Sequence, residues 1–376
     1  MQIPNDLETI INKITEYGYE VYLIGGSVRD YLLGYKVFDY DLTTSAQTTI
    51  IKKILSDYKI DDYREKYGSL KIHSNNNIYD LTTMRIEEGV ENKRYPEKIA
   101  FTTSLKEDCY RRDFTINAIA YNLKSGYIDY FNGLRDLKNK EIHFIGDSYK
   151  RIIEDPIRII RGLRFSLKLG FKIDINDLKL MNDNSMLISK LGMIRFEELW
   201  KILKITGSSE FIKNNINIFK NAYPEINFLL EDNSTYCYRI AMQLEKKYIV
   251  DMHMTNIDYR IVMALKDYVY EMPTIYNIKL KMIKYGDIFA NLLKVISSIN
   301  DDYYQQALTF YEEIVNNNLL VDKKNLKISF DDLNKYDYTS KEKGIILSKL
   351  YDMCLKDDSL NEKDKLIFLA QTIIKK

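Results

Sequence analysis

The first third of the chain alternates between helix-like and strand-like spacing of its apolar residues. From Leu7 to Ile14 apolar residues recur at i, i+3, i+4 and i+7, which predicts an amphipathic helix. Asn5 or Asp6 is expected to cap this helix, and Gly18 is expected to end it. The pattern therefore opens on a helix that buries one face.

Four short segments predict strands, and a second helix is expected from Ser27 to Leu33. The segments are VYLI (21–24), which precedes two glycines, DYDLTT (39–44), SLKIHS (69–74) and NIYDLTT (77–83). The stretch from Arg85 to Glu97 is polar and irregular, so we expect it to form a mobile loop.

Beyond about residue 145 the pattern becomes helical almost throughout, with few turn signals and no convincing series of strands. No repeat at a fixed period is visible, and no linker marks a boundary. The sequence therefore predicts an α+β fold, in which an N-terminal α/β head precedes a long helical remainder.

Composition narrows the classes of function. Of 376 residues, 55 are Lys or Arg and 54 are Asp or Glu, so the formal net charge of +1 excludes a basic coat over the whole chain. No apolar run approaches the roughly 18 residues of a membrane span, and the N-terminus lacks a signal-peptide pattern. Three widely spaced cysteines fit a reducing cytoplasm, and only three histidines argue against a His-ligated metal centre. We expect a cytoplasmic protein that does not bind membranes.

The segment around Gly25 and Gly26 predicts a phosphate-binding turn. Glycines let the backbone approach a ligand closely, and the helix that opens at Ser27 points free N–H groups to the same place. Two glycines before a helix are weak evidence alone, because many such turns bind nothing. The carboxylates that follow strengthen the prediction.

Three aspartates predict a site for divalent metal ions. Asp39 and Asp41 would share one face of a strand, and two adjacent carboxylates repel each other unless a cation lies between them. Oxygen ligands of this kind suit Mg²⁺. Asp80 would complete a carboxylate triad if its strand lies beside that of Asp41. Together with the glycine turn, this pattern is typical of two-metal phosphoryl transfer.

Two arginine-rich clusters follow. RRDFTINAIAYN (111–122) places two adjacent arginines before an apolar helix face, and one of them could clamp a triphosphate. EDPIRIIRGLRFSLKLG (154–170) predicts a helix that Asp155 caps and Gly170 ends, with arginines at 158, 161 and 164 drifting slowly around one side. A solvated charged face and a purely structural cap remain possible interpretations of these two segments.

The pair Asp155 and Arg158 suggests a way to select a base. Cytosine and adenine both offer an amino donor beside a ring-nitrogen acceptor, whereas guanine and uracil offer the reverse. A carboxylate beside a guanidinium matches the first pattern, and a mismatched base leaves polar groups unpaired. The pair could therefore accept C and A without a nucleic-acid template.

Five segments in order resemble the motifs of the class II tRNA nucleotidyltransferases, a family that shares its first motif with bacterial poly(A) polymerases. The segments are LIGGSVRDYLLG with FDYDLTTSA (23–46), RRDFTINAIAYN (111–122), DYFNGLRDLKNKEI (129–142), EDPIRIIRGLRF (154–165) and IRFEELWKIL (194–203). They cover a little over half of the chain. The resemblance implies template-independent addition of CCA to tRNA from CTP and ATP, with Mg²⁺.

The resemblance also implies the roles of individual residues. Asp39, Asp41 and Asp80 would be catalytic, and Asp39 and Asp41 would bind the metal. The residues expected to bind the nucleotide are Gly25, Gly26, Ser27, Arg29, Arg112, Asn117, Asp155, Arg158, Arg161 and Arg164. In this family Asp155 and Arg158 read the base, while Arg161 and Arg164 line the triphosphate side.

The implied organisation has four parts. They are a polymerase-β-like nucleotidyltransferase head over 1–145, a helical neck with the nucleotide-selecting helix over 146–210, a helical body over 211–300 and a helical, tRNA-binding tail over 301–376. The loop 84–101 has the length expected of complete CCA enzymes, although Tyr95 replaces the second of two arginines that usually precede the proline there.

Three alternatives stay open. Members of the family that add only A, or a poly(A) tail, share the selecting pocket and differ in product. An RNA-binding protein without catalysis would keep its activity after Asp41→Ala. A nucleotidyltransferase for small molecules would share only the glycine turn and the carboxylates, and it would incorporate nucleotides without any RNA.

Overall fold

The computed structural model describes residues 1–88, 98–228, 235–250 and 252–373. The chain forms two compact units, Met1–Asp232 and Asn233–Lys376. The predicted boundaries near residues 145, 210 and 300 are finer than this division and stay predictions.

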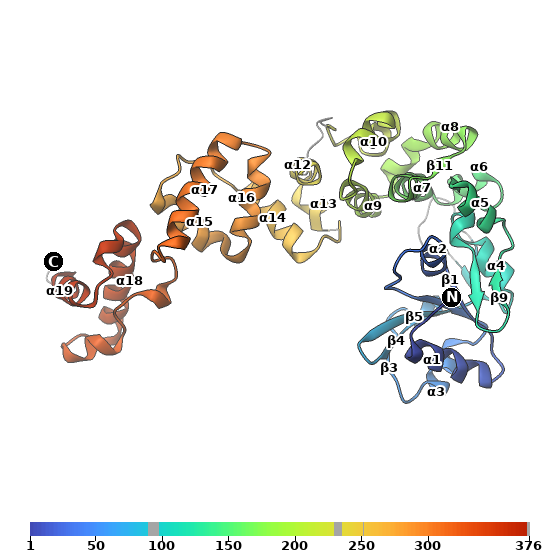
Figure 1. Ribbon diagram of the computed structural model, residues 1–376, viewed down its shortest axis with the longest axis horizontal. Coiled ribbons are helices and arrows are strands. Elements are labelled where there is room, and N and C mark those ends of the chain that lie inside the picture. Colours follow the sequence, from blue (N-terminus) through green and yellow to red (C-terminus); the bar gives the residue numbers. More distant parts are fainter. Residues whose placement is uncertain (89–97, 229–234, 251, 374–376) are drawn as a thin grey trace. The chain divides into compact units, whose positions relative to one another are not determined.

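The first unit is built on a seven-stranded sheet with the strand order β3-β4-β5-β2-β1-β8-β9 (Figure 1). The strands are β1 (Val21–Ile24), β2 (Asp41–Thr44), β3 (Lys59–Asp61), β4 (Ser69–Ser74), β5 (Asn77–Thr83), β8 (Ala120–Asn122) and β9 (Gly126–Ile128). β2 and β5 are parallel, and the other neighbouring pairs are antiparallel. The four predicted strands are confirmed as β1, β2, β4 and β5, although β2 is two residues shorter than predicted.

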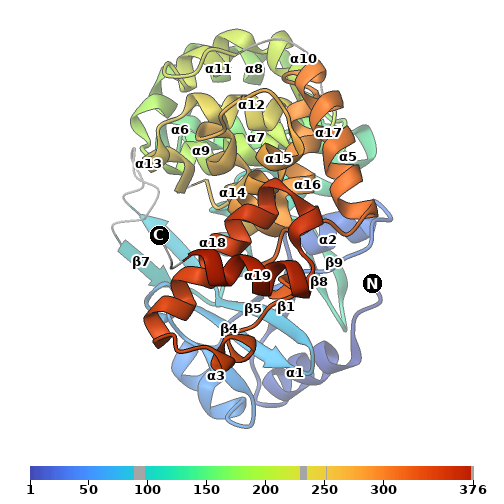
Figure 2. The same ribbon diagram turned by 90° about the vertical axis from the view of Figure 1, so that its left-hand side faces the viewer.

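Helices α1 (Asn5–Glu16) and α3 (Thr48–Ile54) lie together on one side of the sheet, as both ribbon views show (Figures 1 and 2). The apolar stripe of α1 is buried from Leu7 to Ile14, which confirms the amphipathic prediction. The cap differs from the expectation, because Pro4 takes the N-cap position and makes no side-chain hydrogen bond. Helix α2 (Gly26–Leu32) follows β1 as expected.

The rest of the first unit is mainly helical. Its helices are α4 (Leu105–Tyr110), α5 (Gly133–Asn139), α6 (Ser148–Glu154), α7 (Ile157–Leu169), α8 (Ile175–Asp183), α9 (Ile194–Leu203), α10 (Ser208–Asn214) and α11 (Ile216–Ala222), with 3-10 turns η1 (Glu65–Tyr67), η2 (Thr115–Asn117) and η3 (Ser185–Lys190). Two-residue strands β10 (Glu141–Ile142) and β11 (Lys172–Ile173) pair in parallel.

Three local predictions were wrong. Arg85–Glu88 forms strand β6, which pairs with β7 (Lys98–Phe101), where an irregular loop was expected. The apolar segment after residue 114 forms a 3-10 turn and β8 instead of a helix. Asp39 precedes β2 and lies outside any strand. Pairing between strands explains the three differences. β6 pairs with β7, β8 pairs with β1, and the pairing of β2 begins only at Asp41. Residues 94–96 of the predicted loop lie outside the described residues.

The second unit is helical. Its helices are α12 (Tyr236–Gln243), α13 (Lys246–Val250), α14 (Asn256–Lys266), α15 (Ile275–Tyr285), α16 (Phe289–Ser297), α17 (Asp301–Asn316), α18 (Ser340–Lys356) and α19 (Lys363–Ile373), with 3-10 turns η4 (Gly286–Ile288), η5 (Lys323–Asn325), η6 (Asp331–Lys335) and η7 (Asp358–Leu360). One apolar cluster packs α14 to α17, and another packs the segments from Leu320 to Ala370. Across the described ranges, no helix has the length and apolar character to span a membrane.

Candidate active site

A cavity of about 460 Å³ in the first unit gathers most of the predicted site residues. It is lined by Gly25, Gly26, Arg29, Asp41, Arg85, Arg111, Arg112, Asp113, Asn117, Asp155, Ile157, Arg158, Arg161, Arg164, Phe165, Lys168, Ile194 and Glu198. Eight of these side chains are cationic and four are acidic, which suits a polyanionic ligand such as a triphosphate. Asp39, Asp80 and Ser27 are absent from this lining among the described residues.

The turn between β1 and α2 requires a glycine at position 25. Gly25 has φ +80°, and a Cβ there would lie 3.1 Å from Nη1 of Arg112 and 3.7 Å from Oδ2 of Asp41. A side chain would therefore strain the backbone and crowd both charged groups. Ser27 is buried, and its hydroxyl donates to the carbonyl of Ile24 at 3.3 Å. Its hydroxyl thus stabilises the turn, and the prediction that Ser27 binds nucleotide rests on its backbone.

Asp41 and Asp80 lie directly opposite each other on the parallel strands β2 and β5. Although the Asp41 side chain is accessible to water, surrounding protein atoms partly desolvate it, and this raises its pKa. The carboxylates of Asp80 and Asp39 raise the pKa further, while Arg112 opposes them. Lys71 lies 3.4 Å from Asp80. The negative charge of Asp41 is thus destabilised by burial and by its carboxylate neighbours, as expected where a divalent cation would bind.

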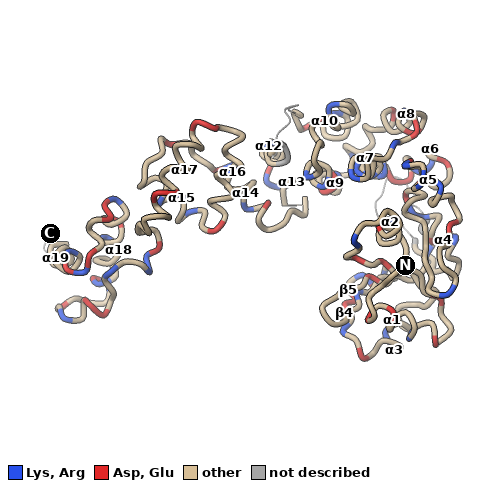
Figure 3. The backbone as a smooth tube through the Cα atoms, in the orientation of Figure 1, with Lys and Arg blue, Asp and Glu red and all other residues tan. Residues whose placement is uncertain are grey.

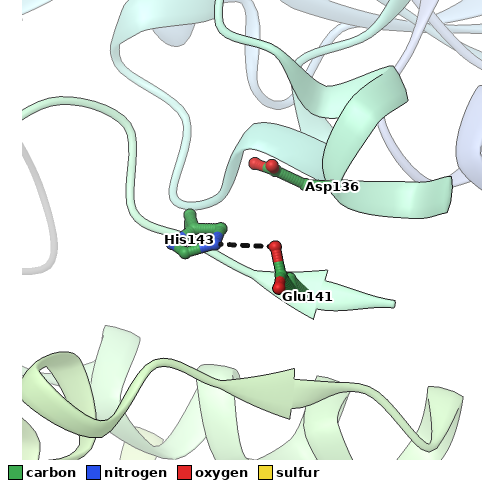
Figure 4. Close-up of side chains that lie close together, drawn as sticks. All are labelled: Asp136, Glu141 and His143. Atoms are coloured by element: carbon green, nitrogen blue, oxygen red, sulfur yellow. Dashed lines mark hydrogen bonds and ion pairs between the residues drawn. The ribbon is translucent and has the colours of Figure 1, made fainter. Parts of the chain in front are cut away.

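Figure 4 shows another group of possible metal ligands, which comes from α5, β10 and the residue after β10. One ligand atom each from Asp136, Glu141 and His143 lies within 4.8 Å of the others, and within the described ranges this is the one such group of three. Asp136 already accepts hydrogen bonds from the hydroxyl of Thr115 at 2.6 Å and from Arg135 at 3.0 Å. The group does not line the cavity, and we assign it a structural role.

Asn117 and Asp113 connect helix α2 to helix α7. Oδ1 of Asn117 accepts from Nη1 of Arg29 at 2.6 Å, and its amide donates to Asp113 at 3.0 Å. The other oxygen of Asp113 accepts twice from Arg161, at 2.8 and 2.6 Å. Burial raises the pKa of Asp113, but Arg161 and the hydrogen bonds outweigh burial and lower it to about 2. Through these bonds Asn117 orients Arg29 and Asp113 orients Arg161, and both arginines line the cavity.

Asp155 and Arg158 both line the cavity, the first from the α6–α7 junction and the second from the first turn of α7. Asp155 lies between the two helices and accepts from the N–H of Ile157 at 3.3 Å. Burial raises its pKa, and Arg158 opposes this effect. Nη1 of Arg158 donates to Glu154 at 3.0 Å and to the carbonyl of Arg151 at 2.8 Å. The backbone N–H of Arg158 donates to the carbonyl of Asp155 at 3.1 Å. Within the described residues, the hydrogen bonds of the Arg158 guanidinium go to Glu154 and to backbone carbonyls and not to the Asp155 carboxylate.

Arg161 and Arg164 each have a carboxylate partner from another element. Arg161 pairs with Asp113, and Arg164 pairs with Glu198 of α9 at 2.7 Å. Figure 3 shows positive positions along α7 and positions of both signs along α9. The ring of Phe165 lies under the Arg164 guanidinium at 4.4 Å. The stripe is thus ion-paired, and it retains N–H groups beyond these bonds for a ligand.

Sequence reasoning missed several residues of the site. Asp108, Glu154 and Glu198 were given no role, although each holds an arginine that lines the cavity. Arg85 and Lys168 also line it. The available signal was the excess of arginines in two motifs, because buried arginines need carboxylate partners. Two of the partners lie at helical spacing from their arginines, since Asp108 precedes Arg111 by three residues and Glu154 precedes Arg158 by four. The partner of Arg164, Glu198, lies 34 positions away and depends on the tertiary fold.

Comparisons with known proteins show what the chain is similar to. The family described as "Poly A polymerase head domain" matches residues 21–143. The CCA-adding enzyme of Ligilactobacillus salivarius is 29% identical over 387 residues, which cover 97% of this chain and 95% of that protein. The CCA-adding enzyme of Limosilactobacillus fermentum is 40% identical over 195 residues, which cover 52% of this chain and 48% of that protein. The chain thus aligns with about half the length of this second relative.

Two solved structures share the fold. The Bacillus stearothermophilus CCA-adding enzyme in complex with CTP superposes with a TM-score of 0.70 at 20% identity, covering 99% of this chain and 98% of that one. The Thermotoga maritima CCA-adding enzyme complexed with tRNA gives a TM-score of 0.53 at 19% identity, covering 99% and 96%. The predicted α+β fold class, with a sheet-containing head and a helical remainder, is confirmed.

Proposed function

The chain belongs to the family of class II CCA-adding tRNA nucleotidyltransferases and bacterial poly(A) polymerases, and we propose that it builds the CCA end of tRNA without a nucleic-acid template. In this reaction the terminal 3′-hydroxyl of the tRNA attacks the α-phosphate of CTP twice and then that of ATP. Each step forms one P–O bond, releases pyrophosphate and frees the proton of the attacking hydroxyl.

The observation that carries the proposal is one cavity lined by both the carboxylate strand and the base-selecting pair. Asp41, Asp155 and Arg158 all belong to its lining. A nucleoside triphosphate requires both features, because its phosphates bind cations and its base is recognised by directional hydrogen bonds. The other arginines of the same lining supply the positive charge for the triphosphate.

The selecting pair supports C and A as substrates. The Asp155 carboxylate accepts from the exocyclic amino group, and the Arg158 guanidinium donates to the ring nitrogen. Because Glu154 and the Arg151 carbonyl already hold one nitrogen of Arg158, the guanidinium is oriented before the nucleotide arrives. Guanine or uracil would place a carbonyl against the carboxylate and leave it unpaired, which costs about 1–3 kcal/mol.

Family membership implies use of a divalent metal, and we propose Mg²⁺ as the ion. Asp39 and Asp41 would hold it, with Asp80 completing the carboxylate set opposite Asp41. Hard oxygen donors favour Mg²⁺ over softer metals. When bound, the ion supplies Lewis-acid stabilisation of charge on the reacting phosphate and oxygens.

We further propose that tRNA is the partner and that the protein works in the cytoplasm. The relative from Thermotoga maritima was solved with tRNA, which supports this choice. The helical body over 211–300 and the tail over 301–376 would bind the tRNA. The curated relatives are named CCA-adding enzymes, which favours complete CCA addition over the A-adding and poly(A) alternatives.

Replacement of Asp41 tests the proposal. Asp41→Asn should lower nucleotide addition at least about 10³-fold, because the carboxylate both carries charge and lies at the centre of the donor set. Asp61→Asn is the matched control, since Asp61 lies on the edge strand β3 of the same sheet and pairs with His73. Addition by Asp41→Asn at the rate of Asp61→Asn would contradict the proposal.

A further inference from the structure

Asp108 is a fully buried carboxylate that bonds to three elements around the cavity. It lies in α4 with 0% of its surface exposed. One oxygen accepts from Nε of Arg111 at 2.9 Å and from the backbone N–H of Arg85 at 3.2 Å. The other accepts from the hydroxyl of Thr43 at 3.3 Å and from Nη2 of Arg112 at 3.4 Å. Asp108 itself does not line the cavity.

The charge of Asp108 keeps two adjacent arginines together. Burial raises the pKa of Asp108, but Arg111 and Arg112 outweigh burial and hold it below its usual value. The carboxylate is therefore ionised at neutral pH. Two neighbouring guanidiniums without it would repel each other and turn toward water, because a buried cation needs a partner.

The bonds of Asp108 fix Arg112 relative to the carboxylate strand. Thr43 lies two residues after Asp41 on β2, so both side chains are on one face of the strand. Arg112 approaches the glycine turn, where its Nη1 would lie 3.1 Å from a Cβ on Gly25. A shift of Asp108 would thus move Arg112 away from the place where the turn would bind phosphate.

The same contacts reach the base-selecting pair. The backbone carbonyl of Arg111 accepts from Nη2 of Arg151 at 2.9 Å, and that of Arg112 accepts from the same nitrogen. Arg151 also pairs with Glu154, which holds Arg158 at 3.0 Å. One carboxylate therefore sets the position of the arginine segment on which both the triphosphate side and the selecting side depend.

We propose that Asp108 is a positioning residue for the nucleotide: it orients Arg111 and Arg112 toward the triphosphate without touching the substrate. The inference rests on the proposed function in one respect, namely that the ligand of the cavity is a nucleoside triphosphate. It predicts a defect in nucleotide binding rather than in tRNA binding.

Asp108→Asn is the direct test, because it keeps the shape of the side chain and removes its charge. Its amide can still meet Thr43, but an N–H group would face a guanidinium. The Kd of a non-hydrolysable CTP analogue and the KM for CTP should rise about tenfold or more, as expected for lost hydrogen bonds to charged groups. The KM for tRNA should stay within about twofold, since the side-chain partners of Asp108 all lie between residues 43 and 112, whereas the proposed tRNA-binding body and tail begin at residue 211.

Asp136→Asn is a closely matched control. Asp136 is also 0% exposed, lies on a short helix, accepts from a threonine hydroxyl at 2.6 Å and pairs with an arginine at 3.0 Å. It does not line the cavity. Both variants should lose stability by similar amounts, measured from the fluorescence of Trp200, the only tryptophan of the chain. The Kd for the analogue should rise only in Asp108→Asn.

A second pair of variants covers the case in which Asp108→Asn does not fold. Thr43→Val removes the hydroxyl that donates to Asp108, whereas Thr44→Val removes a hydroxyl that donates to the Glu20 carbonyl on the other face of β2. Both threonines are 0% exposed. Thr43→Val should weaken analogue binding about threefold, and Thr44→Val should not change it.

Two outcomes would overturn the inference. One is wild-type affinity for the analogue in folded Asp108→Asn, or in Thr43→Val when that is the variant tested. The other is an equal loss of affinity in a variant and its control, since that would be a general effect of destabilisation. Failure of the proposed function would look different, because the wild-type chain would then bind the analogue without adding CCA, or would not bind it at all.

Discussion

The ion pair between Asp113 and Arg161 allows a quantitative prediction of stability. Asp113 is 8% exposed, and its pKa of about 2 lies below the unperturbed 3.8 because Arg161 and its hydrogen bonds outweigh burial. A difference of about two pKa units corresponds to about 2.5 kcal/mol. The Arg161 side chain is 37% exposed, so solvent screens the pair, and we expect about 1–2 kcal/mol.

The sign of the pH dependence follows from the lowered pKa. A carboxyl whose folded pKa is depressed contributes its full stability above the unfolded value of 3.8 and loses it as the pH falls toward 2. Asp113→Asn should therefore unfold at lower urea than the wild type at pH 7. The difference between the two proteins should shrink to about half at pH 3.

Asp177 provides the matched control. It is also 8% exposed, but burial raises its pKa, so its charge destabilises the fold at pH 7. Asp177→Asn should leave stability unchanged or increase it. Urea unfolding of the whole chain, followed by Trp200 fluorescence, reports on the first unit, which contains this residue at 5% exposure.

With a denaturant slope of about 3 kcal/mol per molar, Asp113→Asn should lower the urea midpoint by about 0.5 M at pH 7. Equal midpoints for Asp113→Asn and the wild type would refute the reasoning. So would a midpoint difference that stays constant between pH 7 and pH 3, because the effect would then not come from the charge.

Three further predictions concern selection, packing and metal. Asp155→Asn should lower the preference for CTP over UTP, measured as a ratio of kcat/KM, by about 10–100-fold, because an amide pairs with either base edge; an unchanged ratio would refute the selecting role. Gly133→Ala places a Cβ 2.3 Å from the carbonyl oxygen of Thr115 and should destabilise the protein by about 1–3 kcal/mol in chemical unfolding followed by circular dichroism. Gly344→Ala in α18 meets nothing within 4 Å and should gain up to about 1 kcal/mol, so equal effects of the two glycine variants would contradict the packing described. Chelation by EDTA should stop nucleotide addition and excess Mg²⁺ should restore it, whereas full activity in EDTA would exclude the proposed metal.

The strands that the sequence predicted are those whose pattern is visible locally. NIYDLTT alternates in burial along β5, and VYLI is buried throughout. Arg85–Glu88 was missed as a strand because it lacks an apolar period, and pairing with Lys98–Phe101 supplies its structure. Sequence spacing thus found elements that bury a face and missed one that depends on its partner.

The candidate site shows the same limit. Asp41, Asp155 and Arg158 stand in motifs whose chemistry can be reasoned from neighbouring residues, and all three line the cavity. The prediction that Asp39 shares a strand face with Asp41 was wrong, because β2 begins only at Asp41. The placement of Asp80 beside Asp41 was conditional on strand order, and the parallel pairing of β2 with β5 satisfies it.

The contacts that join the carboxylate partners of the arginines to distant segments could not be found from sequence alone. Asp108 contacts Thr43 across 65 positions, and Arg164 contacts Glu198 across 34. Such contacts depend on the closed fold, so no local period or cap reveals them. A local signal did exist for two partners, because Asp108 and Glu154 stand three or four residues before arginines, but the sequence analysis did not use it.

Product analysis on defined tRNAs tests the central claim most directly. The protein would receive tRNAs that end before CCA, after C and after CC, with Mg²⁺ and each nucleoside triphosphate in turn, and the products would be sequenced. The account predicts two C additions followed by one A, with G and U refused. Addition of A alone to the CC-ended tRNA, a long A tail on unrelated RNA, or incorporation without RNA would contradict it.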